Sequence, residues 1–177
     1  MGWDQVSLHI YAPGAEPEVS IAPNAMTWTG EPLKIVGDRV IEGFSGKLTG
    51  IEEAERWLIE RGCEVFDRTK TPRESIMLYR GPRLRGDREI EINLYGEAGV
   101  LRSLYCRFAL SSDAPQHLVQ WEELMIPFCE RFQLTIMDRD QRLCPPTQFA
   151  RIVRSYPNWL EFARHHGWPS EDDYHVP

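Results

Sequence analysis

Four arginines lie close together in a stretch that links two segments with strand-like patterns. They are Arg80, Arg83, Arg85 and Arg88. A guanidinium group carries a planar fork of N–H donors that fits carboxylate and phosphate groups. The stretch could therefore bind an anion, a carboxylate-rich partner or RNA. The simpler interpretation is a solvated connection whose charges pair with the acidic surface, and both alternatives stay open.

Acidic residues form a second candidate surface, on and just after two segments with helical periodicity. These residues are Glu52, Glu53, Glu55, Glu60, Glu122, Glu123, Glu130, Asp138 and Asp140. A solvated helix face is the usual explanation for such residues. The alternative is a contact surface for a basic protein, since complementary charge speeds association. Trp57 and Trp121 would then supply the large aromatic side chains that dominate many interfaces.

The motifs of common catalytic and metal sites do not occur in the sequence. It contains no HExxH or G-x-S-x-G motif and no Walker or GxGxxG loop. His165 and His166 are neighbours, and successive residues of a helix point about 100° apart, so their rings cannot easily share a metal. Cys144 has no neighbouring group in the sequence that would lower its pKa. We therefore predict no catalytic residue, no metal site and no cofactor.

Length and composition are those of one ordinary globular domain. The chain has 177 residues, of which 42% are hydrophobic and 27% charged, values typical of globular proteins. Its 20 Lys and Arg against 27 Asp and Glu give a net charge of −7. This balance disfavours a general nucleic-acid binder, which needs an excess of basic charge. The sequence also has no apolar run long enough to predict a membrane-spanning helix.

The amino-terminal sequence and the cysteines indicate a cytoplasmic protein. The first residues have neither the basic region nor the apolar region of a secretory signal. The four cysteines, Cys63, Cys106, Cys129 and Cys144, are not spaced as CxxC pairs. Reduced thiols in a cytosol are therefore the preferred interpretation.

The first half of the chain predicts a lead segment and then a ββαβ unit. Residues 1–30 contain no Lys or Arg and three prolines, which favours an irregular segment over the body of a single domain, 1–177. Residues 33–80 form the first unit, with a hairpin that turns at Gly37 and Asp38. Its helix is expected over 50–61, opened by a capping box from Thr49 to Glu52 and closed by Gly62.

The second half repeats this order over residues 89–138 and ends in a helical cap over 145–168. Two strands precede a helix that Pro127 should kink or split, and a short strand follows. The likeness between the two units fits either a duplication or chance similarity. In both cases the sequence predicts an α+β fold, with mostly antiparallel strands and helices on one face.

The stretch Trp121–Trp168 resembles immunity proteins of bacterial polymorphic and contact-delivered, type VI-like toxin systems. The similar segments are WEELMIPFCERFQLTIMDRDQ, CPPTQFARIV and PNWLEFARHHGWP. The resemblance implies a small acidic cytosolic protein that neutralises a cognate toxin domain, for example a basic nuclease, without doing chemistry. Two other classes remain open: a small α+β enzyme or anion-binding protein using the arginine stretch, and a structural subunit with a large apolar patch.

Overall fold

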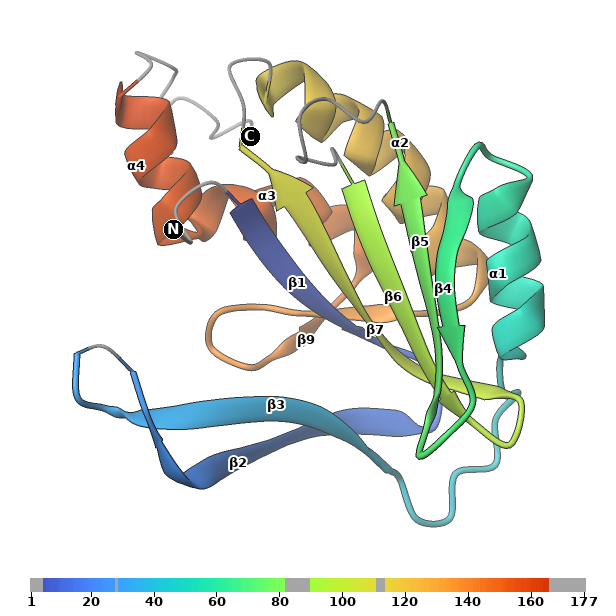
Figure 1. Ribbon diagram of the computed structural model, residues 1–177. Helices are drawn as coiled ribbons and strands as arrows, with labels where there is room; N and C mark the ends of the chain where they lie inside the picture. Colours follow the sequence, from blue (N-terminus) through green and yellow to red (C-terminus); the bar gives the residue numbers. More distant parts are fainter. Residues whose placement is uncertain (1–4, 28, 82–89, 111–113, 166–177) are drawn as a thin grey trace.

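A computed structural model describes residues 5–27, 29–81, 90–110 and 114–165. It has a seven-stranded sheet in the order β4-β5-β6-β7-β1-β8-β9 and a separate two-stranded sheet, β2-β3. All described strand pairs are antiparallel, which confirms the expected α+β class (Figure 1). The strands of the main sheet are β1 (Gln5–Tyr11), β4 (Glu64–Thr69), β5 (Glu74–Arg80), β6 (Ile90–Glu97), β7 (Val100–Ala109), β8 (Thr135–Met137) and β9 (Leu143–Cys144). The other elements are β2 (Ala15–Met26), β3 (Pro32–Val40), α1 (Ile51–Ile59), α2 (Ala114–Arg131), the 3-10 helix η1 (Pro146–Gln148), α3 (Phe149–Ser155) and α4 (Pro157–His165).

Alternation along the strands gives the main sheet two chemically different faces. In β6, Ile90, Ile92 and Leu94 belong to the buried core. Because successive side chains of a strand point to opposite faces, Glu91 and Asn93 must lie on the other side. The core also contains residues of α1, α2, α3 and α4. The helices therefore cover the apolar face, and we call the polar one the helix-free face.

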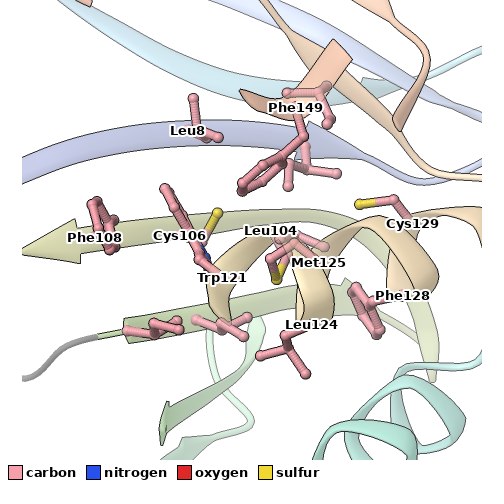
Figure 2. Close-up of a cluster of buried hydrophobic side chains, with 14 of the residues drawn as sticks. Leu8, Leu104, Cys106, Phe108, Trp121, Leu124, Met125, Phe128, Cys129 and Phe149 are labelled. Carbon is pink, nitrogen blue, oxygen red and sulfur yellow. The ribbon is translucent and has the colours of Figure 1, made fainter. Parts of the chain in front are cut away.

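The centre of the core is an aromatic stack between α2 and the sheet. Trp121 of α2 is stacked on Phe108 of β7, with ring centroids 4.9 Å apart, and meets Phe149 of α3 edge-on at 4.8 Å. Figure 2 shows these rings among buried side chains of β1, β7 and α2. Helix α2 runs through Pro127 as one element, so of the two effects predicted for this proline, a kink or a split, the split does not occur.

Helix α1 spans Ile51–Ile59, two residues shorter at its end than predicted, and it begins without the predicted cap. Gly62 has a φ of 91°, a left-handed conformation that glycine adopts without strain, and the helix stops just before it. The N-cap is Gly50, with no side-chain hydrogen bond. The Thr49 hydroxyl instead donates to the carbonyl of Phe132 over 3.4 Å. The predicted capping box is therefore wrong, because Thr49 is used in a tertiary contact with the end of α2.

The amino-terminal segment is the largest correction to the expected fold. Residues 5–11 form β1, which lies inside the main sheet between β7 and β8. Val6, Leu8 and Ile10 alternate with polar residues, and all three are buried. The prolines that suggested an irregular segment fall after β1 or in the peripheral strand β2. The described residues of 1–30 therefore do not form the predicted irregular lead segment over the body.

The first predicted hairpin is also placed wrongly. β3 runs straight through Gly37 and Asp38 and pairs with β2. The actual turn lies at residues 27–31, where the Thr27 amide donates to the Glu31 carbonyl over 2.7 Å. The order ββαβ does recur, but β2 and β3 form their own sheet whereas β6 and β7 are interior strands of the main one. The two units thus do not occupy equivalent positions.

The carboxyl-terminal part is helical as expected. η1, α3 and α4 follow β9, and Phe149, Ile152, Val153 and Trp159 join the core. The last residues of the predicted cap, 166–168, lie outside the described ranges. Among the described helices, none has the length and apolar character needed to cross a membrane.

Candidate functional site

A cleft separates the helix-free face of the main sheet from β3. Its volume is about 440 Å³. Strand register brings its floor together, since β1 and β7 pair His9 with Tyr105 and Tyr11 with Ser103. The principal side chains around it come from five segments: His9, Tyr11, Asp38, Arg73, Tyr95 and Tyr105. The cleft is therefore a product of the tertiary fold.

Asp38 fastens β3 over the sheet. Its side chain is 7% exposed, and Oδ2 accepts a hydrogen bond from Nη2 of Arg73 at 2.6 Å and another from the Ser103 hydroxyl. The Tyr11 hydroxyl donates to the Gly37 carbonyl over 3.0 Å. Burial, and then the charge of Asp38, raise the Tyr11 pKa to about 12, so Tyr11 keeps its proton at neutral pH. These bonds define the angle between β3 and the sheet.

The rest of the cleft wall is aromatic. The rings of His9 and Tyr105 are 5.0 Å apart and tilted. The Arg73 guanidinium carbon lies 5.5 Å from the centroid of the Tyr95 ring. Burial lowers the pKa of His9, so its imidazole is neutral at pH 7. Such groups offer flat apolar surfaces with polar atoms at their edges, which suits recognition of another molecule.

A buried polar network continues the helix-free face beside the cleft. Glu91 is ion-paired with Arg107 of β7, and Nδ2 of Asn93 donates to Oε1 of Glu91 over 2.9 Å. Glu91 and Asn93 are 8% and 7% exposed. Since each buried polar atom in this group has a partner, the network makes the floor beside the cleft rigid.

Beyond the cleft, β2 and β3 project as a two-stranded arm (blue, lower left in Figure 1). In the part of the chain that the structure describes, these strands pair only with each other. Four large apolar side chains on the arm are at least half exposed: Ile21 at 63%, Met26 at 68%, Ile35 at 50% and Val40 at 51%. We call these residues, together with the less exposed Val19 and Leu33, the arm patch. The register pairs Ile21 with Lys34 and Ile35 with Ser20, so Val19 and Ile21 lie on one face of the arm, and Leu33 and Ile35 lie on the other. Large apolar groups that are exposed on both faces of a projecting arm are typical of an interaction site.

The nine acidic residues predicted as a contact surface are divided between internal and exposed roles. Glu55 is buried, and its Oε2 accepts from Nη1 of Arg68 over 2.8 Å, which ties α1 to β4. Asp138 accepts hydrogen bonds from the amides of Asp140 and Arg142, at 2.9 and 2.8 Å. These two carboxylates therefore stabilise the fold.

The other acidic residues lie at or near the surface. Glu53 is 3.6 Å from Arg131 of α2, and Glu122 is 3.9 Å from Arg154 of α3. The remaining members are exposed: Glu52, Glu60, Glu123, Glu130 and Asp140. Their role in binding stays a prediction.

Glu122 leads to a pH-dependent prediction. Burial, only partly offset by Arg154, raises its pKa, so the folded state holds this proton more tightly than the unfolded chain does. The contribution of Glu122 to stability must therefore fall as pH rises from the ordinary value of 4.5 through the folded-state pKa. We expect the difference in unfolding free energy, Glu122→Gln minus wild type, to increase over that interval.

The measurement is denaturant unfolding of both proteins between pH 4 and 8. Glu123→Gln is the matched control, because Glu123 is the exposed neighbour and its substitution should leave the difference from wild type flat. If the difference in unfolding free energy between Glu122→Gln and wild type did not change with pH, the raised pKa of Glu122 would be contradicted.

The tryptophans predicted for the interface and the neighbouring histidines can also be compared with the structure. Trp121 is fully buried, so it cannot be the interface side chain proposed for it, because α2 directs this residue into the core. Trp57 is partly buried, with the Arg61 guanidinium carbon 3.5 Å from its ring centroid. His165 is exposed at the end of α4, and His166 is outside the described residues. Within the described residues no group of three or more His, Cys, Asp or Glu side chains could hold a metal.

The predicted arginine stretch falls mostly outside what the structure describes. Arg80 is the last residue of β5. Arg83, Arg85 and Arg88 lie in the undescribed range 82–89, so the anion-binding alternative that depends on them remains a prediction.

Sequence reasoning missed the cleft residues. His9 and Tyr11 were hidden because residues 1–30 were interpreted as irregular, and Asp38 because it was placed in a turn. One signal was present: polar residues and tyrosines alternate with apolar residues along 90–95 and 103–108. This alternation indicates that the sheet has a second, more polar face, which the helices do not cover.

Comparisons with known proteins add no relative: no family model, no curated protein and no solved structure matches the chain.

Proposed function

We propose that this chain is an immunity protein, which binds a cognate bacterial toxin domain in the cytoplasm and neutralises it without doing chemistry. The observation that carries the proposal is the arm patch beside an aromatic cleft. Ile21, Met26 and Ile35 present apolar area to solvent, and Tyr95 and Tyr105 border the cleft nearby. Buried aromatic and aliphatic side chains supply most of the binding energy in protein interfaces.

The arm supports this proposal through its backbone as well as its side chains. Each of its two strands has one side without a strand partner among the described residues. Unpaired strand edges readily add a further strand from another chain. A toxin segment could therefore bind along the arm while its neighbouring loop fills the cleft.

The net charge of −7 supports a basic partner. In this arrangement the exposed acids Glu52, Glu60, Glu123, Glu130 and Asp140 increase the rate of encounter, whereas the arm and cleft provide most of the affinity. Rim charges chiefly affect association rates and salt dependence, and buried contacts chiefly affect dissociation.

The test is co-expression with the polypeptide encoded by the reading frame immediately upstream. We expect the two purified chains to form a stoichiometric complex, and cells expressing the upstream polypeptide to grow only when this chain is present. Absence of both the complex and the protection would contradict the proposal. Protection without a complex would also contradict it, because neutralisation here requires binding.

A further inference from the structure

A second cavity lies away from the cleft, between the turn that joins β8 to β9 and helix α3. Its volume is about 490 Å³, large enough for a small metabolite. The turn is well ordered: the Asp138 amide donates to the Arg142 carbonyl over 2.9 Å, and the Gln141 amide donates to the Asp138 carbonyl over 3.1 Å. Nη1 of Arg139 donates to the Ser155 carbonyl over 2.8 Å and joins the turn to the end of α3. The cavity therefore has two fixed walls.

Three arginines line this cavity against two carboxylates. Arg139 and Arg142 come from the turn and Arg151 from α3, whereas Asp138 and Asp140 are the acids. Oδ1 of Asp138 is already engaged by the two turn amides. The lining thus carries a net positive charge in a chain whose net charge is −7. A local excess of positive charge in an acidic protein concentrates anions at that point.

The guanidinium groups of Arg142 and Arg151 both affect the thiol of Cys144. Burial and the neighbouring Asp138 raise the pKa of the Cys144 thiol, whereas Arg151 and Arg142 both lower it. Both arginines therefore lie near the Cys144 thiol, which lines the same cavity. In the described parts of the chain, no carboxylate lies within ion-pair distance of the Arg142 or Arg151 side chain. Both groups can therefore bind a ligand without first breaking an internal ion pair.

We propose that this cavity binds the phosphate group of a small phosphorylated molecule, held by Arg142 and Arg151 from opposite walls. The planar donor fork of arginine fits a phosphate in a bidentate way and forms strong charge-assisted hydrogen bonds. The Gln148 side chain also lines the cavity, and its amide can donate to a third phosphate oxygen. The Arg139 guanidinium is held by Ser155 and provides charge at the edge. This site is independent of the arm and cleft, so it can exist whether or not the chain binds a toxin.

The test is a calorimetric titration of the full chain with inorganic phosphate, adenosine monophosphate and glucose 6-phosphate. We expect saturable binding with a Kd of about 1 mM or tighter for at least one of them. Stronger binding of one ester than of inorganic phosphate would identify the attached group as part of the ligand. Equal binding of all three would show that the phosphate alone is recognised. No saturable binding of any probe would overturn the proposal.

Variants locate the site. Arg142→Gln and Arg151→Gln should each weaken binding by about tenfold, the effect of losing one charge-assisted contact. Both residues are exposed, so the melting temperature should change little. Arg56→Gln, an equal charge change on the exposed surface of α1, is the control and should leave the affinity within about twofold. An equal loss in all three variants would overturn the proposal, because the effect would then come from net charge alone.

Discussion

Replacing Trp121 by alanine is expected to lower the free energy of unfolding by about 3–5 kcal/mol, the range for a large aromatic side chain removed from a core. A domain of this kind has a total stability of about 5–15 kcal/mol. The melting temperature should fall by about 6–20 °C, since each kcal/mol corresponds to about 2–4 °C at this chain length.

The reason is the position of Trp121 between three elements (Figure 2). Its ring stacks on Phe108 with only 12° between the planes and meets Phe149 at 82°. Removing it would open a void that α2, β7 and α3 all border. The neighbouring rings are themselves fully buried, so the site can relax only partly into the space.

Two companion variants make this prediction specific. Trp121→Phe should lose less stability, because it keeps a ring against Phe108 and removes an N–H group for which the described residues provide no acceptor. Val119→Ala on the same helix is the exposed control, with 51% of Val119 accessible. If Val119→Ala destabilised the protein as much as Trp121→Ala, the loss would reflect helix formation and not packing. Denaturant unfolding measures all three.

The second large effect should appear in the affinity for the proposed partner, a toxin domain. Ile35→Asp and Ile21→Asp are each expected to raise the Kd of the complex by about 30-fold or more, which corresponds to a loss of about 2 kcal/mol. A carboxylate at either position would have to lose its hydration when the arm is covered, and the apolar contact would disappear. Because both side chains are at least half exposed in the free protein, its own stability should change much less than the affinity.

The matched control is Ile59→Asp, the same substitution at an exposed isoleucine of α1, where 44% of the residue is accessible. It adds the same negative charge away from the arm and should leave the Kd within about twofold. Calorimetric titration of the toxin domain into each variant gives the comparison. Similar losses in all three variants would argue that added charge, and not the arm patch, weakens the complex.

Local sequence patterns predicted much of the main sheet and its helices. The alternation along β6 and β7 and the helical spacing of Ile51, Ala54 and Leu58 correspond to the observed elements. These features depend on neighbouring residues, so they can be recognised in a short window. The predicted ends of the elements were less accurate. The Thr49 hydroxyl, for example, could either cap α1 locally or donate to the distant carbonyl of Phe132, and the sequence does not distinguish the two.

The cleft could not be predicted in this way because its contacts are distant in sequence. Asp38 meets Arg73 and Ser103, which are 35 and 65 residues further along the chain. Gly37 and Asp38 are a strong local turn signal, but the extended pairing of β3 with β2 prevails over it. A single sequence carries no record of which distant segments pair. The dispersed residues of the cleft therefore emerge only when the strands are assembled.

The central place of β1 determines when the protein can fold during its synthesis. Val6 pairs with Phe108 and Ile10 with Leu104, so β1 must wait for about a hundred further residues before its main partner exists. At translation rates of about 5–20 residues per second, this wait lasts about 5–20 seconds. Through that time the apolar side chains of β1 have no core to enter, and its backbone has no neighbouring strand. The nascent chain is therefore most prone to misassociate while the ribosome is still reading the codons between β1 and β7.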